Sequence, residues 1–520
     1  MHLSDILERL QGKSARLTFV SEKGEETVRS LDDLFRDTNA LVAQLKQIGA
    51  APGGRIGILA PNSYHWMVWD LAIMALDCVS VALPQEPPAE AVESIADRRG
   101  LQLLAVDPSL VPAGAMDNPW VLDYKAPAFA GKGVLHQGPI SHAPGTHSLV
   151  FSSGTTGKTK GLIISAPGTE NLLNLYGDAF GTPSDDRLLT FLPFANYQQR
   201  MAYYFCLYHG MEFVYVPFTR MFAGLKKYQP SYIIAPPIFY ESLQNMAQAG
   251  AAPAAAPAAA NDGADSGISA RLAALLGGNI RYLITGMAPI KLQTLEFFWR
   301  HGVKLYEAFG ITEAGMVAWN KPGRMKVGTV GQPAEAGSVT LSEEGEVIVT
   351  RKALLSLGYF EASEEDSRNT FVGPNSVATG DIAEFDEGGF LTIVGRKKDA
   401  IITKAGEKFH PEPIESQIQA IPGVTVAVVM GGDSLPGITA IVSTPHADKP
   451  ETTAAMRERI AGINETLPAS QQLKRVEFTT LEFNVENNFR TKNMKLNRKA
   501  IQSAFVQHGI SLGVAAGGSK

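Results

Sequence analysis

The sequence is poor in cysteine, and neither sign of charge dominates it. Only Cys78 and Cys206 occur among its 520 residues. They form no CxxC pair and show no metal-ligand spacing, which argues against a disulfide framework or a zinc site. This use of cysteine fits a reducing compartment, so we expect the cytoplasm. The 52 acidic and 46 basic residues leave a formal charge of -6 spread along the chain. No nucleic-acid-binding surface is indicated, and a small-molecule substrate is favoured.

Long apolar runs are also missing. The first residues alternate charged and apolar side chains, whereas a secretory signal places a basic start before an unbroken apolar segment. The most apolar later stretch, from Leu71 to Pro84, contains Asp77 and is shorter than the roughly 20 residues of a membrane span. The sequence therefore predicts no integral membrane segment.

What is present is typical of a large globular enzyme. Hydrophobic residues make up 45% of the chain and charged residues 19%, and this length favours two or more domains. Short β-branched or aromatic runs indicate buried strands, and amphipathic patterns from Ser30 and Pro289 predict helices between them. The strand-like runs are HSLVFSS, RLLTFLP, SYIIAPP and RYLITG. Alternating strands and helices predict an α/β fold.

Two changes in composition and sequence pattern divide the chain. Residues 247–267 consist almost entirely of small residues with proline interruptions, so we expect a flexible surface insertion there. Beyond Gly395 a short basic run, a helical pattern and an apolar strand pattern follow in quick succession. We therefore predict an N-terminal domain over residues 1–394, a hinge at 395–399 and a small α+β domain over 400–520.

The strongest local motif is SSGTTGKTKG, residues 152–161, directly after a predicted strand. Glycines permit a tight backbone there, while hydroxyls and amines can face an anion, so the loop suits a polyphosphate. The residues that we expect to contact the nucleotide are Ser152, Ser153, Gly154, Thr155, Thr156 and Lys160. The alternative for such a motif taken alone is an ordinary surface turn.

A P-loop is the rival interpretation, because GKT at 157–159 ends like GxxxxGK[ST]. That pattern requires glycine at position 152, where this chain has Ser152. Gly161, Pro167 and Gly168 also interrupt the helix that a P-loop needs next. A P-loop NTPase is therefore the weaker interpretation.

The loop resembles the phosphate loop of the adenylate-forming superfamily, roughly [ST]SG[ST]TGxPKG, apart from Thr159 in place of proline. This superfamily includes acyl-CoA synthetases, luciferases and the adenylation domains of peptide synthetases. Further motifs follow in the family's order between residues 148 and 499. The resemblance implies a large N-terminal domain, a small mobile C-terminal domain, and ATP with Mg²⁺ as cofactors.

Two downstream segments are similar to those that enclose adenine and the α-phosphate in the family. They are TGMAP, with Gly286, Met287 and Ala288, and YEAFGITEAG, with Ala308, Phe309, Gly310, Thr312 and Glu313. Phe309 offers a flat ring and Thr312 a hydroxyl, while Glu313 could hold a divalent cation. By resemblance, Glu313 binds the magnesium and acts in catalysis together with Thr312.

ATGDIAEFDEGGFLTIVGRKKD, residues 378–399, resembles the family's ribose segment and hinge. It implies that Asp381 and Arg396 contact the ribose and that Lys398 is the hinge residue. Near the end, TKNMKLNR keeps the T-x-x-G-K-x-x-R spacing, with Met494 in place of glycine. Lys495 is then the candidate catalytic lysine, whose ammonium can stabilise charge between the carboxylate and the α-phosphate.

The segment LPFANYQQR, residues 192–200, concerns the binding of the acid substrate. It is similar to LPLAHxxER of long-chain acyl-CoA synthetases. Asn196 stands in place of the histidine and Gln199 in place of the glutamate. Asn196 and Tyr197 are our candidate substrate residues. No aspartate is present to hold an α-ammonium, so an α-amino acid is disfavoured.

The resemblance implies ATP-dependent activation of a hydrophobic carboxylic acid, a fatty or related acyl acid, to an acyl adenylate with release of pyrophosphate. Transfer to the thiol of CoA or of a carrier-protein phosphopantetheine follows. Three alternatives stay open: transfer to an amine, activation of an aryl acid, and a non-catalytic nucleotide-binding protein. The last would be expected to lack Lys495, Glu313 or Asp381, and all three are present.

Overall fold

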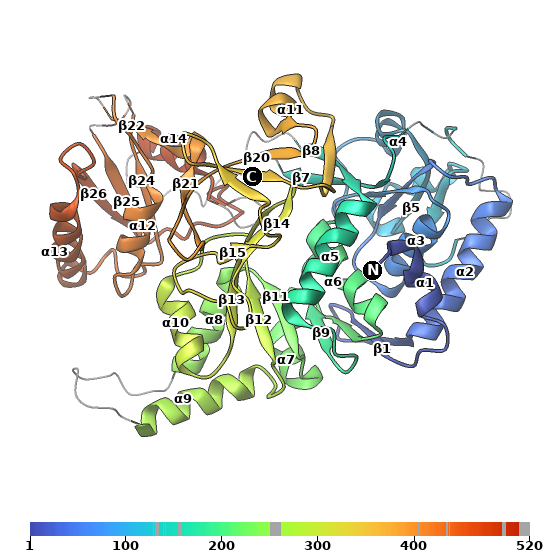
Figure 1. The fold of residues 1–520 in the computed structure, drawn as a ribbon, viewed down its shortest axis with the longest axis horizontal. Coiled ribbons are helices and arrows are strands. Elements are labelled where there is room, and N and C mark those ends of the chain that lie inside the picture. The colour runs from blue at the N-terminus through green and yellow to red at the C-terminus, as the bar shows by residue number, and fades with distance from the viewer. Residues whose placement is uncertain are drawn as a thin grey trace.

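The structure is a computed structural model that describes residues 1–127, 129, 135–138, 140, 142–153, 159–249, 262–403, 406–432, 435, 437–490 and 496–508. The side chains of residues 152–153, 159, 262–265 and 508 lie outside that description. The described residues form five β-sheets with helices around them (Figure 1), which confirms the α/β class.

One large sheet has seven strands and contains the strand that leads into the predicted phosphate loop. Its order is β18 (Ser356–Phe360), β8 (Thr159–Ser165), β7 (Thr146–Ser153), β4 (Val79–Ala82), β3 (Arg55–Leu59), β5 (Leu101–Val106) and β6 (Val121–Asp123). The pairs from β7 to β6 are parallel, whereas β8 runs antiparallel to β7 and to β18. A strand therefore follows the loop, which differs from the helix of a P-loop.

The second large sheet has nine strands. Its order is β15 (Gln332–Pro333), β14 (Gly315–Trp319), β13 (Leu305–Ile311), β12 (Tyr282–Thr285), β11 (Tyr232–Ala235), β9 (Arg187–Thr190), β10 (Glu212–Tyr215), β1 (Arg16–Val20) and β2 (Glu26–Ser30). The strands from β13 to β1 are parallel, as expected for strands buried on both faces.

Helices cover these sheets and separate them. They are α1 (Ile6–Arg9), α2 (Leu31–Gln47), α3 (Tyr64–Ala75), α4 (Val92–Arg99), α5 (Ala166–Phe180), α6 (Tyr197–His209), α7 (Met221–Tyr228), α8 (Pro237–Gln248), α9 (Asp262–Leu275) and α10 (Leu292–Arg300). In Figure 1, α5 and α6 lie between the two large sheets, and one core cluster draws residues from both sheets and both helices. No described helix is long and apolar enough to cross a membrane.

Local sequence signals account for several of these elements. Ser30 caps α2: its hydroxyl accepts from the Asp33 amide, and the Asp33 carboxylate accepts from the Ser30 amide, which satisfies two donors at the helix start. Gly49, with φ of 89°, follows the end of that helix. The helix predicted from Ser30 and the strands predicted before Gly154, Phe194, Pro236 and Met287 are confirmed.

A third sheet lies between the large sheets and the C-terminal part of the chain. It contains β16 (Val339–Leu341), β17 (Glu346–Thr350), β20 (Ser376–Phe385) and β19 (Phe371–Gly373), with β21 (Leu391–Arg396) paired to β20. Helix α11 (Glu364–Thr370) packs against β19 and β20. The 3₁₀ turn Lys397–Asp399 follows β21 directly.

The residues after this turn form a smaller α+β unit at one end of the molecule (Figure 1). It contains a hairpin, a three-stranded sheet and three helices among its described residues: β22 (Ile401–Ile402), β23 (Lys408–Phe409), α12 (Glu412–Gln419), β24 (Val426–Met430), β25 (Thr439–Ser443), α13 (Pro450–Thr466), β26 (Arg475–Thr479) and α14 (Arg498–His508). Two core clusters of its own stabilise the unit.

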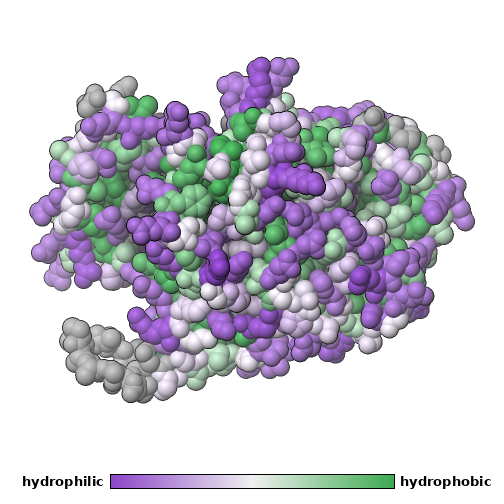
Figure 2. All heavy atoms as spheres, in the orientation of Figure 1, coloured by the Kyte–Doolittle hydropathy of each residue, from purple (hydrophilic) through white to green (hydrophobic). Residues whose placement is uncertain are grey.

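The predicted insertion at 247–267 lies partly outside the described residues. Helix α8 continues to Gln248 and α9 begins at Asp262, so helices occupy both ends of that segment. On the face shown in Figure 2, hydrophilic side chains predominate with apolar ones scattered between them, an ordinary distribution for a folded protein.

Candidate active site

A hydroxyl joins the base of the predicted phosphate loop to Glu313. Lys160 lies opposite Ser152 in the β7–β8 pair. Its ammonium is 2.7 Å from a carboxylate oxygen of Asp366 and 5.2 Å from the centre of the Tyr359 ring. The Tyr359 hydroxyl donates a hydrogen bond of 2.8 Å to Glu313 Oε1. Lys160 and Glu313, predicted from separate motifs, therefore contact the same tyrosine side chain, Lys160 at its ring and Glu313 at its hydroxyl.

The electrostatics keep this group in fixed ionisation states. Burial raises the pKa of Tyr359, and the carboxylate of Glu313 raises it further, so the hydroxyl stays protonated and donates. The hydrogen bond from Lys160 lowers the pKa of Asp366, so this pair stays charged. Gly154, Thr155 and Thr156 lie outside the described residues, as do the side chains of Ser152 and Ser153.

The TGMAP and YEAFG segments meet at the ends of neighbouring parallel strands, β12 and β13. A Cβ added to Gly286 would lie 3.1 Å from the Ala308 carbonyl oxygen, so the two backbones are close. Met287 has a positive φ of 72°, a conformation that L-residues rarely adopt, and Ala288 follows it. The pairing of β13 with β14 shifts between Phe309 and Gly310, where Val317 of β14 is the extra residue of a bulge. Backbone of irregular geometry therefore lines this edge of the sheet.

Thr312 and Glu313 lie on the turn between β13 and β14, where Thr312 is exposed. A guanidinium holds the far side of that turn. Arg351 donates from Nη1 to the Ala314 carbonyl at 2.8 Å and from Nη2 to the Met316 carbonyl. The Arg351 side chain is fully buried, and its Nε is 3.3 Å from Glu335 Oε2.

Asp381 and Arg396 lie opposite one another in the β20–β21 pair. Arg396 Nε is 2.9 Å from Asp381 Oδ1, and Asp381 is only 3% exposed. The 3₁₀ turn after Arg396 contains the predicted hinge residue Lys398. The two predicted ribose residues are thus brought together directly before the smaller C-terminal unit.

The carboxylate-side motif lies at the start of α6. Asn196 caps the helix, since its Oδ1 accepts from the Gln198 amide at 3.2 Å. Tyr197 is buried, and its hydroxyl is 2.7 Å from Thr169 Oγ1. Gln199 is buried as well and accepts from the Thr190 hydroxyl at 2.6 Å. Asn196 and Gln199, which depart from the family motif, therefore have partners that stabilise the helix.

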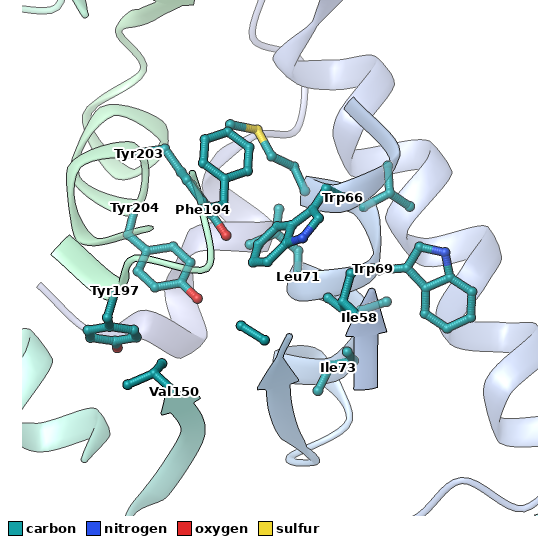
Figure 3. Packing of buried hydrophobic residues seen from close by; sticks show 14 of the residues in the cluster. Ile58, Trp66, Trp69, Leu71, Ile73, Val150, Phe194, Tyr197, Tyr203 and Tyr204 are labelled. Carbon is teal, nitrogen blue, oxygen red and sulfur yellow. The ribbon is translucent and has the colours of Figure 1, made fainter. Parts of the chain in front are cut away.

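Arg200 of α6 forms a fully buried ion pair with Asp70 of α3. Tyr203 and Tyr204 also donate to Asp70, and Arg200 donates to Ser148 Oγ at 2.7 Å. Figure 3 shows Tyr203 and Tyr204 of α6 on the same side as Trp66 of α3, whereas Trp69 points away from them. The network links helix α6 to β7, the strand that leads into the phosphate loop.

A cavity of about 60 Å³ lies between α5, α6 and the nine-stranded sheet. We call it the acid cavity. It is lined by Leu172, Leu173, Tyr176, Gln198, Met201, Ala202, Phe205, Tyr232, Ile234, Ile284, Met316 and Trp319. No lining residue carries a formal charge. Ile284 is two residues before Gly286 and Met316 three after Glu313, so the cavity adjoins both predicted nucleotide segments.

Comparison with known proteins decides the family. The AMP-binding enzyme family matches residues 8–360, and the C-terminal domain of AMP-binding enzymes matches residues 398–508. The chain belongs to the AMP-binding enzyme family. The two matches cover the phosphate loop, the segments around Gly286 and Glu313, and the segment of Lys495, while Asp381 and Arg396 lie between them.

Curated relatives of this AMP-binding enzyme include ligases of fatty acids. The long-chain-fatty-acid–CoA ligase FadD15 of Mycobacterium bovis is 26% identical, over 89% of this chain and 88% of its own length. Long chain acyl-CoA synthetase 7 of Arabidopsis thaliana, a peroxisomal protein, is 22% identical over 93% and 81%. The AMP-binding enzyme is thus an AMP-forming ligase of carboxylic acids, as its motifs predict.

Solved structures confirm the fold of a large N-terminal and a smaller C-terminal domain. MatB of Rhodopseudomonas palustris with bound ATP has a TM-score of 0.76 at 20% identity, covering 98% of this chain and all of its own. The anthranilate CoA ligase AuaEII in complex with anthranoyl-AMP has a TM-score of 0.74 at 21% identity, with 97% of both chains covered.

The candidate lysine of this AMP-binding enzyme, Lys495, lies outside the described residues. The arginine of the same motif, Arg498, forms a bidentate pair with Glu415 of α12, at 2.5 and 2.6 Å. It also lies 3.7 Å from Asp399 in the 3₁₀ turn Lys397–Asp399. The start of α14 is therefore held against both that turn and α12.

Sequence reasoning missed Tyr359, Asp366, Arg351 and the aromatic lining of the acid cavity. Tyr359 and Glu313 are 46 positions apart, so no local spacing connects them. Arg351 follows a strand in the short basic run TRK, which is typical of a solvated surface. Only the packing of β14 against the β17–β18 connection shows that its side chain is buried.

Proposed function

We propose that this ligase activates a hydrophobic monocarboxylic acid with ATP and transfers the acyl group to the thiol of CoA or of a carrier-protein phosphopantetheine. The observation that carries the proposal is the uncharged acid cavity, whose walls lead to Gly286 directly after β12 and to Glu313 in the turn before β14. A charged or strongly polar acid would leave unpaired groups in such a cavity. An aryl acid also meets this condition and is included.

Different residues would contact the phosphates, the adenine and the ribose of the nucleotide. The loop of Ser152, Ser153, Gly154, Thr155 and Thr156, together with Lys160, is suited to the phosphates. The backbone of Gly286, Met287 and Ala288 and the segment Ala308–Gly310 would enclose the adenine. Asp381 would accept hydrogen bonds from the ribose hydroxyls, with Arg396 beside it.

A magnesium ion fits the donor set at Glu313. Tyr359 occupies one oxygen of this half-buried carboxylate, and Mg²⁺ is commonly held by one or two carboxylates together with substrate phosphates and waters. When bound, the ion would neutralise charge on the phosphates. Thr312 offers a hydroxyl on the same turn, and Lys495 would supply a further positive charge beside the reacting α-phosphate.

Two bond exchanges complete the reaction. A carboxylate oxygen attacks the α-phosphorus, and the bond to pyrophosphate breaks. A thiolate sulfur, having lost its proton, then attacks the acyl carbon, and AMP leaves. We propose that the C-terminal unit turns about Lys398 between the two steps, withdrawing Lys495. The two free, buried thiols, Cys78 and Cys206, suit a reducing compartment such as the cytoplasm.

The test is acid-dependent pyrophosphate release from ATP, with the nucleotide product identified and CoA present or absent. AMP formation accelerated by CoA supports the proposal. AMP formation without acceleration by CoA, but with acceleration by a phosphopantetheine carrier, assigns the acceptor to a carrier protein. Acceleration by an amine instead identifies an amide-forming ligase, and ADP as product contradicts the proposal.

A further inference from the structure

The inner end of the acid cavity is a layer of aromatic rings. Tyr176 of α5 and Tyr232 of β11 line the cavity, together with Phe205 and Trp319. Directly behind them, the Tyr176 hydroxyl is 2.8 Å from the hydroxyl of Tyr282 on β12. The hydrogen bond joins a helix to the sheet across the end of the cavity.

The sheet register fixes how deep this end lies. Ile234 pairs with Ile284 and Tyr232 with Tyr282 in the β11–β12 ladder. Residues two apart on a strand face the same side of the sheet, so the two isoleucines and the two tyrosines lie on one face. From Gly286 inward, the isoleucines come first and the tyrosines lie deeper. From Gly286 to Tyr282 is four residues, or about 13 Å at roughly 3.3 Å per residue. The hydroxyl pair therefore closes a short cavity.

Rings brace the closing tyrosine from both sides. Phe180 stacks on Tyr282 with centroids 4.9 Å apart, and Tyr232 stacks on it at 5.4 Å. The Arg281 guanidinium lies 4.6 Å from the Tyr282 ring and pairs with Asp186. An acid reaching further would have to break the hydroxyl pair and displace these rings.

The side walls of the acid cavity move more easily than its aromatic end. Met201 and Met316 line the cavity from α6 and β14. Methionine side chains rotate easily and adapt to irregular shapes, whereas stacked rings do not. The cavity is small, at about 60 Å³, so an acid enters by moving these methionines sideways. The cavity can widen without becoming longer.

We propose that the Tyr176–Tyr282 pair sets a length limit, so that the enzyme activates compact monocarboxylic acids, either short or medium alkyl chains or a single aromatic ring, and rejects long-chain fatty acids. The inference deepens the proposed function and rests on it. Tyr282 and Tyr176 are specificity-determining residues in this assignment, and neither takes part in the chemistry.

The test measures kcat/KM for AMP formation with butanoate, octanoate, benzoate, dodecanoate and palmitate. The wild-type enzyme should favour octanoate or benzoate over palmitate by at least about tenfold, in line with the selectivity of apolar cavities. Tyr282→Ala should raise the dodecanoate-to-octanoate ratio at least about tenfold. Tyr282→Leu, which keeps more volume, should shift the ratio in the same direction if the alanine variant folds poorly.

Tyr240→Phe is the matched control. Tyr240 is also buried, and its hydroxyl bonds the Ile284 carbonyl at 2.8 Å, but it belongs to the core cluster on the other face of the sheet. This variant should leave the ratio unchanged. Equal use of palmitate and octanoate by the wild type would overturn the length limit, as would an unchanged ratio in both Tyr282 variants.

Failure of the proposed function has a different signature. In that case no acid of any length supports AMP formation. The length limit is then tested by thermal stabilisation of the wild type and of Tyr282→Leu with the same acids. Stronger stabilisation of the wild type by octanoate than by dodecanoate, lost in the variant, supports the limit. Equal stabilisation of the wild type by both acids overturns it.

Discussion

Two arginines are completely buried beside the candidate site, and they are stabilised in different ways. Arg200, on α6, lies against the fully buried carboxylate of Asp70. Arg351 lies behind the Thr312–Glu313 turn, where its terminal nitrogens donate to backbone carbonyls and the nearby Glu335 is one-third exposed. One cation is therefore neutralised by a buried charge and the other is held mainly by dipoles.

The pKa directions follow this difference. Burial lowers the pKa of both guanidinium groups, but Asp70 and the neighbouring tyrosines together outweigh it for Arg200, whose pKa is raised well above its ordinary value. For Arg351 burial prevails, and its pKa is lowered in spite of Glu335. The Arg200 pair thus anchors the core, whereas Arg351 has the geometry of a clamp that positions a turn.

The largest effect is expected from Asp70→Ala. The change leaves Arg200 buried without its counter-charge, which should cost about 3–5 kcal/mol of unfolding free energy. Urea denaturation measures the loss. Asp186→Ala is the matched control, because its partner Arg281 is partly exposed and water can take the place of the carboxylate. A loss below about 1 kcal/mol for Asp70→Ala would contradict the anchoring role.

Arg351→Met should affect activity more than folding. It leaves the carbonyls of Ala314 and Met316 without their donor, at a cost of about 1–3 kcal/mol. Loosening the turn of Thr312 and Glu313 should lower kcat by about tenfold while KM for the acid changes little.

Two variants distinguish positioning from a general loss of stability. Arg351→Lys should restore part of kcat, because an ammonium can still reach one carbonyl. Lys352→Met changes the neighbouring exposed residue and should behave like the wild type. If kcat of Arg351→Met equals that of the wild type, Arg351 only stabilises the fold.

The Arg200 centre should also respond to acid, through His147. Burial, together with the charge of Arg200, lowers the pKa of His147 from its ordinary value of 6.5 to about 3. Below pH 6.5 the unfolded chain binds a proton that the folded protein excludes. Stability from this group is complete above pH 6.5 and falls by about 1.4 kcal/mol per pH unit below it, until about pH 3.

Denaturation at pH 6.0 and 5.5, within that window, and at pH 7.0, above it, measures this slope. His147→Gln, which cannot gain the proton, should flatten it. The clamp at Arg351 offers the contrast, because its described partners include no histidine. An equal slope in the wild type and in His147→Gln would contradict the assignment.

The same contrast shows what a sequence can predict. Asp381 and Arg396 lie in one continuous segment, residues 378–399, whose resemblance to a family motif was enough to select them. The carbonyls that Arg351 contacts and the carboxylate that Tyr359 contacts lie 35 to 46 positions away. Their pairing depends on how separate sheets pack, which periodicity and motif spacing do not encode.

The limits of prediction from the sequence are clearest at the acid cavity. The motif at 192–200 drew attention to Asn196 and Tyr197, yet Tyr197 is buried against Thr169, and the cavity is lined by Gln198, Met201, Ala202 and Phe205 from the same helix. The same helix lines the cavity that we propose for the acid. Which of its faces meets the sheet follows only from the packing of α5 and α6 between the two large sheets.

The smallest effect is expected where a single neutral hydroxyl is lost. Tyr359→Phe removes the donor to Glu313 Oε1 but keeps the ring against which Lys160 lies. A hydrogen bond to a charged group contributes about 1.5–3 kcal/mol when buried and less where water can replace it. Glu313 is half-buried, so KM for ATP should rise severalfold with little change in stability. Titration of Mg²⁺ at fixed ATP should show a matching loss of apparent affinity if Tyr359 orients Glu313 toward the ion. A raised KM for the acid alone would instead assign Tyr359 to the walls of the acid cavity, and the hydroxyl would then have no part in holding the nucleotide.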